Sequence, residues 1–255
     1  TGVGRIVVIS GEAGIGKSRL AAELRDHAAG DGEDTVAGGC QPYYTNVALW
    51  PISTLIERAL GLDDESEDVR LDRLVDHLTE IGVDPTTAVP YLAPLIGVSD
   101  PPGYTASIID ATARLQETLT ALVGWVGRLG ARHRRLFLIE DLHWADPTTL
   151  ILLGMLAADP PAGILSVFTT RDAADLPWLE GTTHLSLDRL DDERAAEIVD
   201  DLAASSALSP EVRQSIIARS EGIPLFVEEL TCSILDTGLP ADETLPYRLQ
   251  ELMTG

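Results

Sequence analysis

Short apolar runs alternate with amphipathic stretches along most of the chain. Five runs can form strands: Ile6–Ile9, Thr35–Cys40, Leu136–Ile139, Ile164–Thr169 and His184–Leu187. Ile6–Ile9 and Leu136–Ile139 have the apolar character of buried strands. Segments with apolar residues at every third or fourth position separate these runs and predict helices. Because strands joined by long helical crossovers pair in parallel, the pattern predicts an α/β fold with a five-stranded parallel sheet flanked by helices.

The predicted helices fall into two groups. Those before residue 187 are Lys17–Ala29, Val47–Leu60, a helix through Leu71 and Ile81, Thr87–Ile96, Ile108–Leu129 and Pro147–Ala158. Those after it are Asp191–Ala203, Pro210–Ser220 and Leu225–Leu235. We therefore predict an α/β domain over residues 1–187, with a helical insertion at about residues 47–130, and a small lid-like helical domain over residues 188–255. The segment Gln41–Asn46 is expected to be irregular.

The first apolar run leads into a glycine-rich loop that reads GEAGIGKS and then into a predicted helix. Glycines let a backbone wrap an anion, and the helix N-terminus adds unpaired N–H groups, so this context predicts a phosphate-binding loop. In such a loop the lysine reaches the β- and γ-phosphates and the serine hydroxyl, here Ser18, binds Mg²⁺. The alternative, a glycine-rich turn with an exposed lysine, is disfavoured by the GxxxxGKS spacing. The predicted nucleotide-binding residues are Gly11, Glu12, Ala13, Gly14, Ile15, Gly16, Lys17, Ser18 and Arg19.

Charged residues follow two further predicted strands. Glu140 and Asp141 end the third apolar run. In a phosphate-binding fold, a carboxylate at this place faces Mg²⁺ and a second one orients an attacking water. Arg171 follows the fourth run, where a fixed cation could sense or stabilise a γ-phosphate. The alternative for Arg171 is an exposed arginine at the end of a strand.

The chain is strongly acidic. Lys and Arg number 18 against 41 Asp and Glu, which gives a net charge of -23 at pH 7. The field of such a chain repels polyanions, so direct binding of nucleic acid or of an anionic membrane by this segment is not expected. The one basic cluster is interpreted as favourable charge at a helix C-terminus and in a solvated loop, with a polyanion-binding surface as the alternative. Its members are Arg128, Arg132, Arg134 and Arg135.

The remaining composition favours a cytoplasmic protein. Cys40 and Cys232 form no CxxC pair, and the five histidines show no metal-ligand spacing, so both thiols are expected to be reduced and mostly buried. The longest apolar run, Leu150–Ala158, is far shorter than the roughly 18 residues of a membrane helix. No signal peptide precedes the first strand and Thr1 is not a methionine, so we expect an excised piece of a longer chain.

Four stretches together resemble a known family. They are Gly11–Ser18, Cys40–Tyr44 with Ala48–Pro51 (CQPYY and ALWP), Leu138–Asp146 (LIEDLHWAD) and Glu221–Leu230 (EGIPLFVEEL). They resemble the STAND class of P-loop ATPases within the AAA-related group. The chain looks most like the module of large bacterial regulators that is fused to class III adenylate cyclase domains or to LuxR-type DNA-binding domains.

This resemblance implies ATP or ADP with Mg²⁺ as ligands and gives roles to single residues. Glu140 would be the acid on the Mg²⁺ side, Asp141 the acid that polarises water, and Arg171 the γ-phosphate sensor. Pro224 would lie against the adenine. Ile223 stands where family members often have asparagine, so a polar contact from that position is lost. The segment that helps hold the base before the first strand, and the winged-helix domain that usually follows, are expected outside this sequence.

Several functions fit these features. In the first, the chain is a slow ATPase that acts as a switch, with output and sensor domains attached in the same chain and a possible nucleotide-dependent self-association. In the second, it is a nucleotide-binding scaffold with negligible hydrolysis. A small-molecule or nucleoside kinase shares the loop but leaves LHWAD and the helical tail unexplained, and the NKxD string of GTP-specific proteins is missing. The ATPase switch accounts for the most features.

Overall fold

A computed structural model describes residues 2–30, 34–106, 110–131, 134–174, 176–203 and 208–237. The chain divides into two compact units. The first, here the sheet unit, comprises Thr1–Ile9 and Ala21–Leu185. The second, here the helical unit, comprises Ser10–Leu20 and Ser186–Gly255, so the glycine-rich loop groups with the C-terminal helices. The predicted domain boundary near residue 188 stays a prediction.

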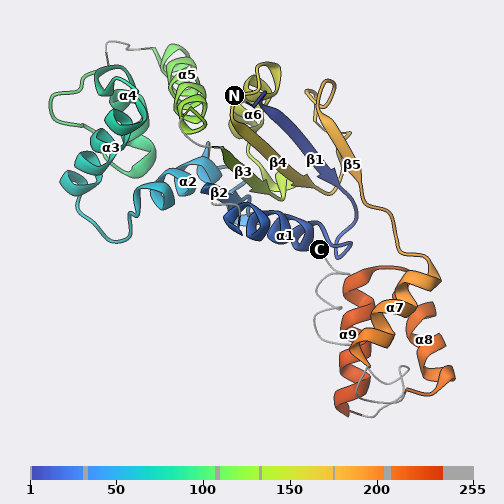
Figure 1. The fold of residues 1–255 in the computed structure, drawn as a ribbon. Helices are drawn as coiled ribbons and strands as arrows, with labels where there is room; N and C mark the ends of the chain where they lie inside the picture. The colour runs from blue at the N-terminus through green and yellow to red at the C-terminus, as the bar shows by residue number, and fades with distance from the viewer. Residues whose placement is uncertain are drawn as a thin grey trace. The chain divides into compact units, whose positions relative to one another are not determined.

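The sheet unit is built around one five-stranded β-sheet. Its strands lie in the order β2-β3-β4-β1-β5 (Figure 1). β3 pairs in parallel with β2, where Phe137 is opposite Val36, and with β4, where Phe137 is opposite Ser166. The predicted α/β fold with a five-stranded parallel sheet is confirmed. The strands are β1 (Arg5–Ser10), β2 (Asp34–Gly39), β3 (Arg135–Glu140), β4 (Ile164–Thr170) and β5 (Thr183–Ser186).

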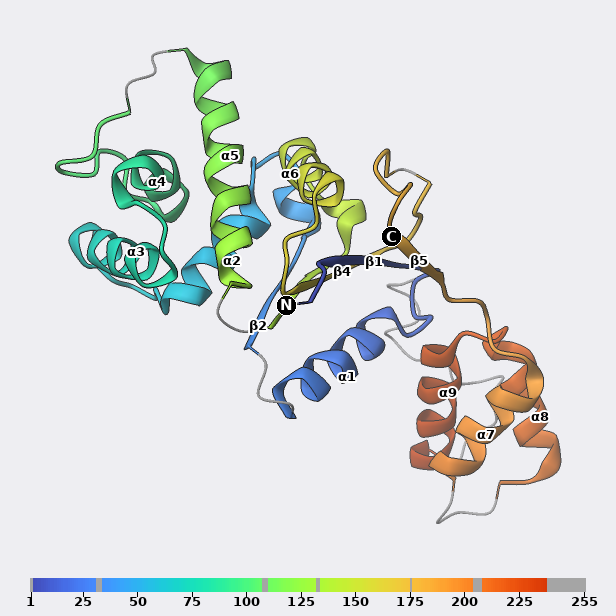
Figure 2. The ribbon, with the colours of Figure 1, turned by 45° about the horizontal axis from the view of Figure 1, so that its top comes forward.

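The central strands are apolar because both faces of the sheet are covered. Leu136, Phe137, Leu138 and Ile139 of β3 are at most 2% exposed, as expected for a parallel strand buried on both sides. Helix α1 (Lys17–Gly30) covers one side of the sheet and α6 (Pro147–Ala158) the other (Figure 2). The edge strand β5 is exposed along its length.

A series of helices lies between β2 and β3 in the chain. Its core is continuous with that of the sheet unit and contains Trp125, which is 1% exposed and donates its indole N–H to His77 Nε2 at 3.1 Å. Asp84 and Asp110 cap two of its helices through their carboxylates. Its elements are α2 (Trp50–Leu60), α3 (Glu67–Ile81), α4 (Pro85–Leu92), the 3-10 helix η2 (Ala93–Ile96) and α5 (Ala111–Leu129). Ile108, where the last helix was predicted to begin, lies outside the described residues.

The helical unit contains α7 (Asp192–Leu202), α8 (Pro210–Ser220) and α9 (Pro224–Thr237). Val199, Ile216 and Val227, one from each helix, are fully buried in a shared apolar core. Asp191 and Ser209 accept backbone hydrogen bonds as the N-caps of α7 and α8. Capping and apolar spacing therefore explain these helices from local sequence.

A few details differ from the predictions. Helix α2 begins at Trp50 rather than Val47, because Leu49 adopts a left-handed backbone with φ 59° that interrupts the helix. The segment expected to be irregular contains a 3-10 turn, η1 (Pro42–Tyr44). Cys40 is buried as expected, but Cys232 is exposed on α9, so the prediction of two mostly buried thiols was wrong for Cys232. None of the helices in the described ranges combines the length and apolar character that a membrane crossing demands.

Candidate functional site

The glycine-rich loop in the helical unit has a backbone that only glycines adopt easily. Gly11 and Gly14 have φ of 154° and 76°. A β-carbon at Gly11 would lie 2.9 Å from the carbonyl oxygen of Leu187, and one at Gly14 would lie 3.0 Å from Ile223 Cγ2. The two glycines are thus required both for the turn of the loop and for its close approach to the C-terminal part of the chain.

Lys17 holds its amine inside this loop. Its Nζ donates to the backbone oxygens of Gly11 at 2.7 Å and Glu12 at 2.8 Å, and the residue is 7% exposed. Phosphate oxygens that enter the loop would compete with these two carbonyl groups for the ammonium. Ser18 and Arg19 follow in the first turn of α1, and both are exposed. Lys17 is also the only lysine in the chain.

The C-terminal motif that contains Pro224 reaches the loop within the helical unit. Pro224 is the half-buried first residue of α9, and the N–H of the next residue, Leu225, donates to the carbonyl oxygen of Gly14 at 3.2 Å. Arg19 adds an exposed ion pair to Glu228 at 2.6 Å. The structure therefore brings together two of the stretches on which the family resemblance was based.

Arg189 is a residue near the loop that the sequence did not single out. Its guanidinium contacts Glu12 of the loop with two nitrogens, at 2.8 and 3.2 Å, and Glu221 with a third, at 3.2 Å. The hydrogen bonds that Arg189 donates to the Glu12 carboxylate lower the pKa of Glu12 and raise the pKa of Arg189. The pairing joins positions 177 residues apart, so no local pattern could have indicated it.

The two predicted acids lie in the sheet unit, where β3 ends. Glu140 is the half-buried last residue of β3. Asp141 has a left-handed backbone, with φ 60°, and its N–H donates to the hydroxyl of the buried Thr169 on β4 at 3.0 Å. Its carboxylate lies 3.9 Å from His143 Nδ1 and its side chain is 43% exposed. The end of the neighbouring strand thus fixes the turn that presents Asp141 to solvent.

Arg171 follows β4 directly and is exposed. Its guanidinium carbon lies 5.8 Å from the centre of the Trp144 ring, a cation–π arrangement. Because parallel strands share one carboxyl edge, Arg171 and the two acids at the end of β3 occupy the same edge of the sheet. That edge is where ligands bind in open α/β folds.

Cys40 lies beside the same edge, and its thiol is not a nucleophile. Burial, with the Asp146 and Asp141 carboxylates nearby, raises the pKa of its thiol to about 12. Its N–H donates to the backbone oxygen of Glu140 at 2.8 Å. A thiol that stays protonated near neutral pH is a packing residue rather than a nucleophile.

Each unit supplies side chains of the kind that a magnesium nucleotide requires. In the helical unit, the glycine backbone and the Lys17 ammonium suit phosphate oxygens, and the exposed Ser18 hydroxyl suits Mg²⁺. In the sheet unit, the half-buried Glu140 offers a carboxylate, a group of the kind that binds Mg²⁺. Across the described ranges no group of three or more His, Cys, Asp or Glu residues is arranged to hold a metal ion. Such a cage is unnecessary for Mg²⁺, which takes one or two protein ligands together with phosphates and waters.

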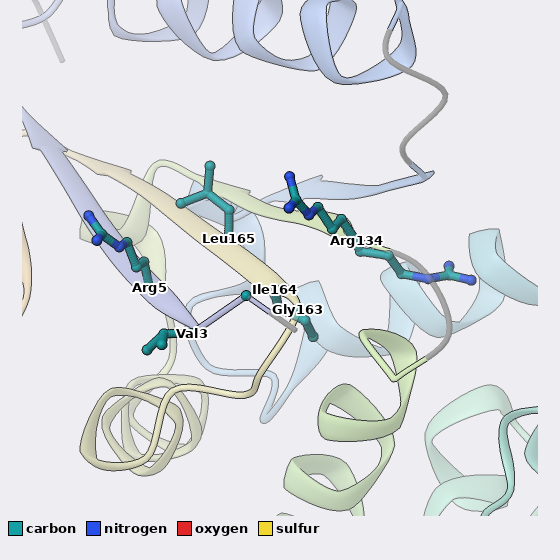
Figure 3. Close-up of a pocket in the computed structure, with 8 residues that line it drawn as sticks. Val3, Arg5, Arg134, Gly163, Ile164 and Leu165 are labelled. Atoms are coloured by element: carbon teal, nitrogen blue, oxygen red, sulfur yellow. The ribbon is translucent and has the colours of Figure 1, made fainter.

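A cavity of about 460 Å³ lies at the other end of the strands (Figure 3). Val3, Ile164 and Leu165 give it apolar walls, and Arg5 and Arg134 lie at its sides (Figure 3). Arg135 also lines it and pairs with Asp34 at 3.1 Å. It lies at the amino ends of β1, β3 and β4, so it is separate from the carboxyl edge with the acids. Arg132 of the predicted basic cluster lies outside the described residues.

Sequence relatives cover the chain well but extend far beyond it. An uncharacterized protein of Rhizobium meliloti (strain 1021) is 27% identical over 237 residues, which are 90% of this chain and 22% of that protein. The chain therefore spans about a fifth of the length of the curated relative that it matches.

Solved structures share the fold at low identity. The ORC1 protein of Aeropyrum pernix, solved in complex with DNA, is 14% identical with a TM-score of 0.51, over 98% of this chain and 59% of that one. A RuvB mutant from Thermotoga maritima is 13% identical with a TM-score of 0.51, over 98% of this chain and 62% of that one. A STAND protein with a tetratricopeptide repeat sensor from Pyrococcus horikoshii is 18% identical with a TM-score of 0.47, over 99% of this chain and 30% of that one.

The family itself follows from a direct match. Residues 1–168, which include the glycine-rich loop and the two acids at the end of β3, match the AAA ATPase domain. The fold, the loop and this match agree, and the chain belongs to the AAA ATPase domain family.

Proposed function

We propose that this chain is the ATP-binding, slowly hydrolysing switch module of a larger bacterial regulatory protein of the STAND class. One observation carries the proposal. The only lysine of the chain lies in a glycine-rich loop between a strand and a helix, with its ammonium held by the loop's own carbonyl groups. In an AAA ATPase domain, that loop is the place for the phosphates of ATP.

The proposed roles follow from the chemistry of each group. Lys17 neutralises the β- and γ-phosphates, and Ser18 with Glu140 holds Mg²⁺, which supplies further positive charge to the phosphates. Asp141 orients the attacking water and Arg171 senses the γ-phosphate. Pro224 packs against the adenine.

Nucleotide binding is tested through the single lysine. Lys17→Ala should weaken Mg-ATP binding at least tenfold in calorimetry, equivalent to roughly 1.4 kcal/mol. Arg25→Ala is a matched control, because it removes an exposed cation from the same helix and should leave the affinity unchanged. ATP should also protect the Lys17 amine from acylation, followed by mass spectrometry at the one lysine. Equal ATP affinity for wild type and Lys17→Ala would remove this function.

Hydrolysis is tested at Asp141. If its carboxylate acts mainly in the transition state, Asp141→Asn should leave ATP affinity within a few-fold and slow single-turnover hydrolysis by roughly 10²-fold or more. Asp159→Asn, an exposed acid at the end of α6, should hydrolyse ATP at the wild-type rate. Unchanged turnover in Asp141→Asn would favour the nucleotide-binding scaffold instead.

The partners belong to the proposal as well. We expect attached output and sensor domains in the same chain, nucleotide-dependent self-association, and a cytoplasmic location. The ORC1 protein was solved with DNA, but the -23 charge of this segment argues against direct nucleic acid binding here. We expect ATP and ADP to favour different placements of the predicted helical domain over residues 188–255. A nucleotide shifts such an equilibrium only if it binds the two states with different affinities.

A further inference from the structure

We propose that Arg189 is a positioning residue for the glycine-rich loop. Its guanidinium neutralises Glu12 and holds the loop to the turn between α8 and α9. The inference rests on the proposed function, because it concerns the same nucleotide site. It adds a residue outside the matched AAA region, since that match ends at residue 168.

The guanidinium of Arg189 uses three nitrogens on two carboxylates. Nη2 lies 2.8 Å from Glu12 Oε2 and Nε lies 3.2 Å from Glu12 Oε1, a bidentate fork. Nη1 lies 3.2 Å from Glu221 Oε2, on the opposite side of the fork. One side chain therefore joins the glycine-rich loop to Glu221, the C-cap residue directly after α8.

The backbone around Arg189 is held on both sides. Two residues before it, the N–H of Leu187 donates to the carbonyl oxygen of Ser10, at the start of the loop, at 2.8 Å. One residue after it, the N–H of Leu190 donates to the carbonyl oxygen of Gly222 at 2.8 Å. Gly222 has a φ of 74°, and any β-carbon there would collide with the carbonyl oxygen of Leu190. The guanidinium of Arg189 is thus presented from a segment whose backbone is held in place on both sides.

The pairing of Arg189 with Glu12 should affect the binding of an anionic ligand, because Glu12 is itself negatively charged. Its carboxylate belongs to the loop whose backbone and Lys17 ammonium suit phosphates, so an unpaired Glu12 would place a like charge beside them. The side chains of Arg189 and Glu12 are 46% and 55% exposed, and an exposed pair contributes little to folding stability. The structure therefore predicts a large effect on nucleotide affinity and a small one on the melting temperature.

The test is a double-mutant cycle on this chain. Affinities for Mg-ATP and Mg-ADP are measured by calorimetry for wild type, Arg189→Ala, Glu12→Gln and the double variant. Arg189→Ala should weaken ATP binding roughly three- to tenfold, and ADP binding less, because the repulsion grows with ligand charge. Adding Glu12→Gln to Arg189→Ala should restore affinity, since the repelling charge is then gone. Arg189→Lys should lie between wild type and Arg189→Ala.

Arg213→Ala is the matched control. Arg213 forms an equally bidentate, exposed pair with Asp200, at 2.7 Å for both contacts, but between α7 and α8 rather than on the loop. It should leave both affinities unchanged. Equal affinities for wild type and Arg189→Ala, or a double variant as weak as Arg189→Ala, would overturn the proposal.

A nucleotide-free measurement separates this inference from the proposed function. Because Lys17 donates to the backbone oxygen of Glu12, a loosened loop should expose its amine, and Arg189→Ala should speed acylation of Lys17 several-fold over Arg213→Ala. If the wild type binds no nucleotide, the proposed function fails. The inference about Arg189 is then tested only by comparing the Lys17 acylation rates of Arg189→Ala and Arg213→Ala. Equal rates would then reject Arg189 as a positioning residue.

Discussion

The backbone N–H of Leu49 donates to the carboxylate of Asp146 at 3.1 Å, across 97 residues. Leu49 is the left-handed residue before α2, and Asp146 is the N-cap of α6. The other bonds to the Asp146 carboxylate come from the Thr148 and Thr149 N–H groups and the Thr149 hydroxyl. One buried carboxylate thus fixes the start of two helices, and it joins two of the motifs on which the family resemblance was based.

Asp146 should therefore be a stability residue. Asp146→Ala leaves buried N–H groups unpaired and should lower the free energy of unfolding by roughly 2–4 kcal/mol. Asp84→Ala is the control, because Asp84 caps α4 from an exposed position, and it should cost about 1 kcal/mol. Urea unfolding measures both. An Asp146→Ala loss no greater than that of Asp84→Ala would contradict this role.

His77 should make stability depend on pH. Burial lowers the pKa of His77, and its Nε2 accepts the indole N–H of Trp125, so the folded state keeps the ring neutral. The unfolded state binds the proton more readily, so the contribution is present above the unfolded pKa of about 6.5 and is lost as pH falls below it. Wild type should lose more stability than His77→Gln between pH 7.5 and 5.5, measured by urea unfolding. His27→Gln, exposed on α1, should behave as wild type. Equal losses in wild type and His77→Gln would exclude this effect.

Arg171 should affect the choice between nucleotides. A γ-phosphate sensor contacts ATP but not the missing phosphate of ADP, so Arg171→Ala should reduce the ATP to ADP affinity ratio several-fold. Arg5→Ala, at the amino end of β1, should leave the ratio unchanged. Calorimetry with both nucleotides provides the ratio. A ratio unchanged in Arg171→Ala would leave Arg171 as an exposed arginine packed on Trp144.

Duplex DNA should not bind this segment at physiological salt, because its net charge is -23. A mobility-shift assay across a range of salt concentrations checks this. If DNA did bind, Arg134 and Arg135 would be the strongest candidates among the described residues to contact it. They lie at the cavity on the amino ends of the strands. A salt-dependent shift that Arg134→Ala abolishes would contradict the prediction.

Local signals in the sequence were sufficient for the fold, and they also predict a phosphate-binding role for the glycine-rich loop, which stays a prediction. The buried strands appear as continuous apolar runs because both faces of a parallel sheet are covered, and Phe137 and Phe168 illustrate this. The loop's role is predicted because phosphate binding requires glycines and a lysine at set spacings, and this chain has them within the eight residues from Gly11 to Ser18. Such features depend on neighbouring residues along the chain, so they can be recognised in the sequence without knowledge of the tertiary structure.

Only the tertiary structure decided the pairings between distant residues. The sequence predicted Asp146 at the start of a helix, but not its hydrogen bond with Leu49. No sequence pattern indicated the ion pair between Arg189 and Glu12. The left-handed turn at Asp141 likewise depends on the Thr169 hydroxyl of a neighbouring strand. Hydrogen bonds and ion pairs of this kind form between groups that the fold brings within about 3 Å, and sequence spacing carries no record of that distance.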